Sequence, residues 1–171
     1  MRRVVFLAKE YRTEPGRSEE VIGICDPEGE KPAYTTTDAK CSDKWIATIK
    51  NSRRAEIQFV PVDKNILMFR DNGEIESSCD GMILYDGDRS LCFIELKDVR
   101  TAGWMSEAIE QLRSTIEIFN KNHDYRDFSD RSAYAANCHH PNFHNSCREK
   151  LQEFRSRTHF RLMPQANVVI K

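Results

Sequence analysis

Residues 79–98 read CDGMILYDGDRSLCFIELKD, and this segment carries the clearest structural pattern in the chain. Two runs rich in β-forming residues, CDGMILY and LCFIELK, flank the turn sequence DGDRS, which is typical of two antiparallel strands joined by a hairpin. Side chains alternate between the faces of a strand, so Glu95 and Lys97 are predicted to project on the same side. Apolar residues fill both faces of this strand before Glu95, which predicts a central place in the sheet.

Asp80 opens the first strand of the hairpin, and Glu95 and Lys97 close the second. Pairing through the turn would place Asp80 beside both of them. Burying these charges costs on the order of several kcal/mol unless they are paired or bind a metal. Two carboxylates suit Mg2+, which lowers the pKa of a bound water and neutralises charge on a phosphate. The residues therefore predict metal-assisted phosphodiester hydrolysis, in which Lys97 orients the attacking water. The alternative is a solvated strand end whose acids pair with lysines.

A helical pattern follows the hairpin. Apolar residues recur with helical spacing from Ser106 to Phe119, which predicts an amphipathic helix lying on a sheet. Pro61 places the end of an earlier strand at an edge or a bend. Further elements are expected on both sides: a short helix over 42–51, strands over 55–62, 132–137 and 166–171, and a second helix over 146–157. The sequence thus predicts an α/β fold with a mixed central sheet flanked by helices.

The chain of 171 residues is long enough for one domain with a substantial core. We expect a single domain over residues 1–171. Turn signals crowd residues 1–42, which predicts an irregular portion with one or two strands. The core is expected over residues 43–171.

The composition is that of a folded, soluble protein, with 39% hydrophobic and 31% charged residues and a net charge of -1. This balance argues against a uniformly basic nucleic-acid binder, although a carboxylate cluster can offset a basic groove elsewhere. No apolar run approaches the roughly 18 residues of a membrane-spanning helix, and no signal-peptide cleavage pattern follows the N-terminus. We therefore expect a cytoplasmic protein without a membrane partner. In that reducing compartment the six cysteines are expected to be thiols or metal ligands.

The hairpin, its Asp and E-x-K residues and the helix after them resemble the core of the PD-(D/E)xK nuclease superfamily, over roughly residues 43–137. That family includes restriction endonucleases, Holliday-junction resolvases and exonucleases. The resemblance implies a restriction endonuclease-like core, Mg2+ or Mn2+ as cofactor, and a nucleic-acid substrate, with DNA expected. By the same resemblance Asp80 and Glu95 would be metal ligands and Lys97 the catalytic lysine. Many small nucleases of this kind act as dimers, so a homodimer is compatible with it.

Gln111 extends the resemblance and other positions depart from it. Some branches of the family carry a catalytic Gln on the helix after the lysine, and Gln111 occupies a comparable place. Those branches have Tyr four residues later, where this chain has Thr115, and Cys79 replaces the Pro before the Asp. The family often supplies a further acid from an earlier segment. The candidates in this sequence are Glu56, Glu74 and Glu76.

Residues 138–147, CHHPNFHNSC, concentrate side chains that can bind zinc. The spacing is not that of a standard zinc finger, and Pro141 with its neighbouring Asn residues is equally typical of a loop before a helix. We favour a structural or substrate-contacting loop over Zn2+. The zinc alternative would use Cys138, His139, His140, His144 and Cys147.

Basic residues gather towards the C-terminus. Such a segment can track a phosphate backbone, although a solvated helix face would look the same. The candidates for nucleic-acid binding are Arg148, Lys150, Arg155 and Arg157. Taken together, the sequence predicts a metal-dependent nuclease. The alternative is a non-catalytic nucleic-acid-binding or interaction module on the same fold, stabilised by zinc.

Overall fold

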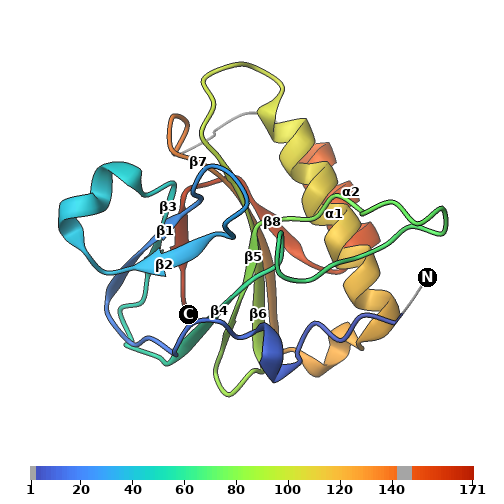
Figure 1. The fold of residues 1–171 in the computed structure, drawn as a ribbon, viewed down its shortest axis with the longest axis horizontal. Helices are drawn as coiled ribbons and strands as arrows, with labels where there is room; N and C mark the ends of the chain where they lie inside the picture. Colours follow the sequence, from blue (N-terminus) through green and yellow to red (C-terminus); the bar gives the residue numbers. More distant parts are fainter. Residues whose placement is uncertain (1–2, 142–147) are drawn as a thin grey trace.

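The computed structural model describes residues 3–141 and 148–171, which form three layers (Figure 1). Two α-helices make one outer layer, a five-stranded sheet lies in the middle, and a four-stranded sheet makes the other outer layer. The protein is therefore of the mixed α/β class. The sequence predicted one mixed central sheet flanked by helices. Both α-helices instead cover a single face, and the second sheet covers the other.

The five-stranded sheet has the order β4-β5-β6-β7-β8. Strands β4, β5 and β6 are antiparallel neighbours, whereas β6, β7 and β8 run parallel. Central β6 and edge strand β4 agree with the predictions from the apolar run and from Pro61. The three-residue strand β8 was not predicted. The bounds are β4 (Ile57–Pro61), β5 (Gly81–Tyr85), β6 (Ser90–Lys97), β7 (Asp130–Asn137) and β8 (Arg161–Met163).

The four-stranded sheet has the order β2-β1-β3-β9 and is also mixed, because β9 pairs parallel to β3. It joins residues from both sides of position 42, so the portion expected to be irregular contributes two strands to a sheet shared with the rest of the chain. The bounds are β1 (Val21–Cys25), β2 (Tyr34–Thr36), β3 (Ala47–Lys50) and β9 (Asn167–Val169).

The prediction of a helix over residues 42–51 is wrong. A short 3-10 helix, η2 (Ala39–Lys44), covers only residues 42–44 of that range, and β3 follows it. Ile46, Ala47 and Ile49 are buried in the core between the two sheets, where pairing with β1 and β9 satisfies their backbone. Tertiary packing thus outweighs the helical spacing.

Two α-helices cover the middle sheet: α1 (Trp104–Asn122) and α2 (Arg148–Thr158). Helix α1 begins after Gly103, whose φ of 94° suits glycine, and it confirms the helix predicted from residue 106. Two further 3-10 helices are η1 (Lys9–Tyr11) and η3 (Tyr125–Asp127). In the described residues no helix is long and apolar enough to cross a membrane.

Strand β6 is buried on both faces. Leu91 and Phe93 face the core under the helices, and Cys92 and Ile94 face the core between the sheets. Polar side chains can enter this packed unit only where the strand ends. That end carries the acid and the lysine of the sequence motif.

Candidate metal centre

Asp80 and Glu95 meet because of the register of the hairpin. Gly81 pairs with Ile94, so the residues on either side of that pair, Asp80 and Glu95, lie across from each other. The backbone N–H of Leu96 donates a hydrogen bond of 2.6 Å to Asp80 Oδ2, which fixes the aspartate against β6. Asp80 is 9% exposed and Glu95 is 2% exposed, so both acids are buried.

Lys97 completes the group. Its Nζ lies 2.9 Å from Glu95 Oε1, and its side chain is 17% exposed. The other carboxylate oxygen, Glu95 Oε2, is buried and accepts no hydrogen bond from an N–H group of the described residues, and the Asp80 carboxyl lies close enough to share a hydrogen bond with the Glu95 carboxyl when one of them is protonated. A simple Glu95–Lys97 ion pair would account for one of these oxygens and would leave the second oxygen and Asp80 without a cation.

Burial shifts the pKa values of both acids upward. Desolvation raises the pKa of Asp80 to about 7, partly offset by the Leu96 hydrogen bond and augmented by the charges of Asp26 and Asp63. Desolvation and the neighbouring Asp80 hold the pKa of Glu95 well above its usual range, against the opposing charge of Lys97. Two buried carboxyls side by side need a proton or a cation to offset their charge.

A set of hydrogen bonds from α1 supports the group. Lys97 Nζ donates to Gln111 Oε1 at 2.7 Å, and Gln111 Nε2 lies 3.4 Å from the carbonyl oxygen of Ser78. One turn later, Thr115 Oγ1 accepts a 2.8 Å hydrogen bond from the Cys79 backbone and donates to the Gln111 carbonyl. The helix therefore positions both the lysine and the chain segment that leads into Asp80.

The structure indicates different additional acids from those that the sequence suggested. Asp26 follows β1 and Asp63 follows β4, and both lie close enough to Asp80 to raise the pKa of its carboxyl. The Asp63 backbone N–H donates to the Cys79 carbonyl, which places it next to the chain that carries Asp80. Asp26 directly follows β1 and Asp63 follows β4 by two residues, so an acid placed just after an apolar strand is the sequence signal that points to them.

The three acids proposed from the sequence have other surroundings. Glu56 precedes β4 at the end where Ile57 pairs with Tyr85, whereas Asp80 lies beyond the Pro61–Gly81 pair at the opposite end. Glu56 is therefore excluded as a ligand beside Asp80. Glu74 and Glu76 both form ion pairs with Arg70, and neither is among the charges that shift the pKa of Asp80 or Glu95.

The donor set fits a hard divalent cation. Two adjacent carboxylates, one with an oxygen lacking an N–H donor among the described residues, are the ligands that Mg2+ and Mn2+ prefer, and two further acids increase the negative potential around them. An ammonium group lies beside them, on the same side of the strand. This arrangement can hold a cation, a water molecule and a phosphate oxygen together.

Among the described residues, the side chains predicted as zinc ligands do not all lie together. Cys138 and His139 lie together and are joined by Asp98, which the sequence interpretation left out. His140 instead stacks on Trp104, with ring centroids 6.1 Å apart. His144 and Cys147 lie outside the described residues.

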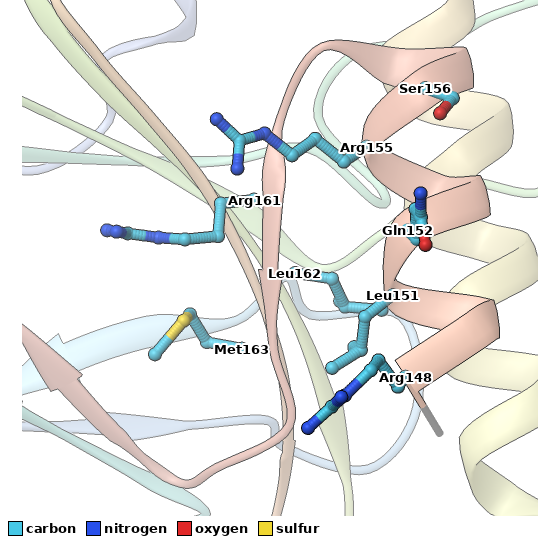
Figure 2. A pocket seen from close by; sticks show the side chains of 8 residues that line it. All are labelled: Arg148, Leu151, Gln152, Arg155, Ser156, Arg161, Leu162 and Met163. Atoms are coloured by element: carbon cyan, nitrogen blue, oxygen red, sulfur yellow. The ribbon is translucent and has the colours of Figure 1, made fainter. Parts of the chain in front are cut away.

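The predicted basic residues of α2 divide between two faces of the helix. Arg148 and Arg155 line a hollow of about 710 Å3 between α2 and β8, where Arg161 joins them (Figure 2). No ion pair or hydrogen bond of these three side chains is found among the described residues. Lys150 and Arg157 face α1 instead, and Arg157 pairs with Glu117 at 3.4 Å. The four residues therefore do not form one surface.

Comparisons with models of protein families, with curated proteins and with solved structures gave no match to this chain. Its function is therefore inferred from the geometry and chemistry of its own residues.

Proposed function

We propose that this chain is a nuclease that depends on a divalent cation and hydrolyses phosphodiester bonds at Asp80, Glu95 and Lys97. One observation carries the proposal: the hairpin register brings two buried carboxyls together beside a lysine, and Glu95 Oε2 is left without an N–H donor among the described residues. A buried oxygen of this kind costs stability unless a ligand uses it.

The proposal includes a restriction endonuclease-like core. Its support is the order of elements around the site: an antiparallel β5–β6 hairpin, a helix directly after the lysine, and a parallel strand beside β6. The helix returns to the site through Gln111, the position at which the resembling family places a further polar residue.

Each side chain of the site would have its own role. Asp80 and Glu95 would hold the Mg2+ or Mn2+ ion, and Asp26 or Asp63 would add charge to the same site. When bound, the cation supplies Lewis-acid polarisation of the phosphate and a lower pKa for water. Lys97 would donate a hydrogen bond to the attacking water or to a phosphate oxygen. Gln111 would keep Lys97 aimed at that position, so it acts as a positioning residue.

Nucleic acid is the substrate class that the surface favours, and DNA is the expected form. The hollow lined by Arg148, Arg155 and Arg161 presents guanidinium groups that have no acidic partner in the described residues. Met163 of β8 lies level with Tyr134 of β7, which lies level with Ile94 beside Glu95. Met163, which lines the hollow, is therefore two strand spacings, about 10 Å, from Ile94. A bound phosphate backbone would run from this hollow towards the metal centre.

A cleavage assay tests the proposal. The purified protein is incubated with supercoiled plasmid, linear duplex and single-stranded DNA in Mg2+, Mn2+ or chelator. We expect cleavage that needs the metal, and a loss of at least about 100-fold in rate for Glu95→Gln and for Lys97→Ala. Lys50→Ala and Glu20→Gln, at exposed positions in the other sheet and just before its strand β1, serve as matched controls and should retain the wild-type rate.

The same assay separates the nuclease from a non-catalytic binding module on this fold. A module would bind DNA without cutting it, and both site variants would then bind and behave as the wild type does. Cleavage that persists undiminished in Glu95→Gln and Lys97→Ala would place the activity elsewhere and would also contradict the proposal.

A further inference from the structure

We propose that Asp98, Cys138 and His139 form a second metal site that takes a zinc-type cation. This site is separate from the carboxylate pair of the metal centre. It lies just past the ends of β6 and β7, and its side chains are not those that the nuclease proposal uses.

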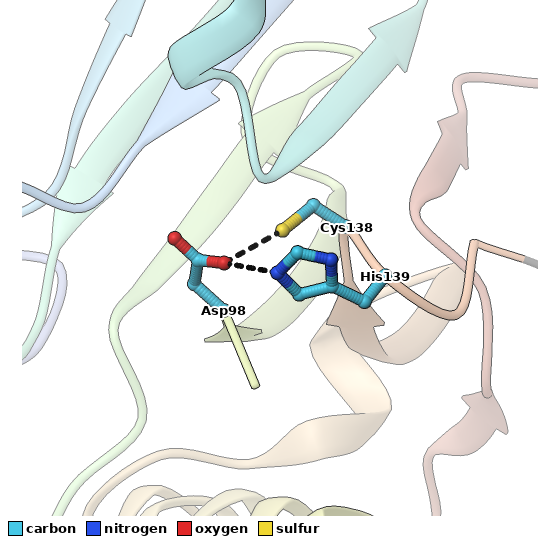
Figure 3. Close-up of side chains that lie close together, drawn as sticks. All are labelled: Asp98, Cys138 and His139. Carbon is cyan, nitrogen blue, oxygen red and sulfur yellow. Dashed lines mark hydrogen bonds and ion pairs between the residues drawn. The ribbon is translucent and has the colours of Figure 1, made fainter. Parts of the chain in front are cut away.

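The three ligating atoms already lie together. Asp98 Oδ1, Cys138 Sγ and His139 Nε2 are all within 4.8 Å of one another. Asp98 Oδ1 lies 2.7 Å from His139 Nε2 and 3.2 Å from Cys138 Sγ, so a single oxygen faces both partners (Figure 3). Figure 3 shows the thiol and the imidazole pointing at the same carboxylate from neighbouring positions on one loop.

The fold produces this meeting from segments about 40 residues apart in sequence. Strands β6 and β7 run parallel, and Lys97 pairs with Asn137, so the next residue of each chain segment emerges at the same end of the sheet. The Cys138 N–H donates to the Lys97 carbonyl at 3.3 Å, and Asn137 Nδ2 donates to the Val99 carbonyl at 2.9 Å. These hydrogen bonds hold the backbone around the three ligand residues without using their side chains.

The donor set selects the kind of cation. Thiolate and imidazole favour zinc and related borderline-soft metals, whereas Mg2+ prefers oxygen ligands throughout. A carboxylate is a common third ligand of zinc, and three protein ligands leave one position of a tetrahedral site open. The two neighbouring sites would therefore discriminate between cations: an oxygen site for Mg2+ or Mn2+, and a mixed nitrogen, sulfur and oxygen site for Zn2+.

The exposure of the ligands suits loading from solution. The Asp98 side chain is 65% exposed and that of His139 is 29% exposed, while Cys138 is partly covered. A cation bound here would cross-link the segment that follows β6 to the segment that follows β7. Lys97 is the residue before Asp98, so this cross-link would brace the strand end that carries the lysine.

Cobalt titration of the metal-free protein tests the site. Co2+ replaces zinc in such sites and gives a thiolate-to-metal absorption band in the near ultraviolet. We expect one equivalent of Co2+ to produce that band, zinc to displace it, and millimolar Mg2+ to leave it unchanged. Cys138→Ser should abolish the band, and Asp98→Asn and His139→Gln should weaken cobalt binding at least tenfold. Thermal unfolding in chelator checks that each variant is folded.

Two control variants test whether the cobalt band is specific to this site. Cys41→Ser removes another partly exposed thiol that lies near an aspartate, Asp38, at 3.6 Å, and it should leave the band intact. Glu95→Gln should also leave it intact, which separates this site from the nuclease proposal. A folded protein that gives no band, or a band that survives in Cys138→Ser or is undiminished in Asp98→Asn, would overturn the assignment.

Discussion

Glu95 is the most deeply buried of the candidate site residues. It is 2% exposed, one carboxylate oxygen contacts Lys97, and the other has no N–H donor among the described residues. Its partner Asp80 is held by a backbone N–H and lies in the field of two further acids. Such groups are retained at a cost in folding free energy, and bound cations offset that cost most directly.

Gln111 provides a test at the level of one side chain. Because Gln111 Oε1 accepts a hydrogen bond from Lys97 Nζ, Gln111→Leu should free the lysine and lower kcat by about 10-fold to 100-fold, with KM for DNA little changed. Gln111→Glu retains an acceptor and should recover most of the rate. Single-turnover and steady-state cleavage measure both quantities. A change confined to KM, or an equal loss in both variants, would contradict the positioning role.

The residues of the candidate site were only partly predictable from sequence. Asp80, Glu95 and Lys97 were found because strand alternation and a hairpin turn are local patterns, whereas Gln111 was found through the resemblance to the nuclease superfamily. The structure brings these four side chains together. Asp26 and Asp63 were missed because their approach depends on how distant strands are placed in space. Asp98 was missed for the same reason, since only the parallel pairing of β6 and β7 brings it to Cys138 and His139.

Among the elements, the hairpin and α1 were the most predictable and the region around β3 the least. Strands β5 and β6 and helix α1 carry strong periodicity over many residues, and each agrees with its prediction. Residues 47–50 form a strand because β1 and β9 pair with them on either side. The three-residue strand β8 is too short to show a period. Its pairing with β7 is likewise set by tertiary structure.

The C-terminal end of α1 leads to a prediction about pH. His123 Nε2 accepts a 3.1 Å hydrogen bond from the Phe6 N–H, and the ring stacks on Phe119. Burial, together with the charge of Arg3, lowers the pKa of His123. The unfolded chain therefore binds a proton more readily, so this histidine contributes stability above its unfolded pKa of about 6.5 and loses it as pH falls through the lower folded value.

Urea unfolding of the wild type and His123→Gln at pH 7.5 and pH 5.5 measures this contribution. The wild type should lose more free energy of unfolding on acidification than the variant, by less than about 1 kcal/mol because the ring is only partly buried. All other titrating groups are common to both proteins, so the difference isolates the histidine. Equal losses in the two proteins would show that His123 does not couple pH to the docking of the N-terminal segment.

In the whole molecule, the polar groups of the candidate sites lie at one end of the middle sheet, because the three layers bury the rest of that sheet. The carboxylate pair, the Asp98 cluster and the hollow between α2 and β8 lie around that end or beside it. The near-zero net charge of the chain conceals this distribution. Acids collect at the candidate metal centre, while three arginines without ion pairs among the described residues line the nearby hollow.

Nucleic-acid binding tests that distribution. Replacement of Arg148, Arg155 and Arg161 by Gln, in a Glu95→Gln background that prevents cleavage, should weaken DNA binding. The slope of log affinity against log salt should fall by up to about 3, near 0.9 for each lost phosphate contact. Fluorescence anisotropy over a salt series measures both effects.

Lys150→Gln with Arg157→Gln is the matched control, because these residues lie on the opposite face of the same helix. That pair should change the affinity and the slope much less. An equal loss from both sets would indicate a diffuse charge effect, and no loss from either set would place the DNA-binding surface elsewhere.

Asp80 and Glu95 are expected to share a divalent cation. Diffraction from crystals soaked in Mn2+, with data collected to reveal the anomalous signal of manganese, tests it most directly. We expect an anomalous peak within coordination distance of both carboxylates, and no such peak in crystals of Glu95→Gln soaked in the same way. Manganese bound elsewhere, with the space between Asp80 and Glu95 free of anomalous density, would contradict it.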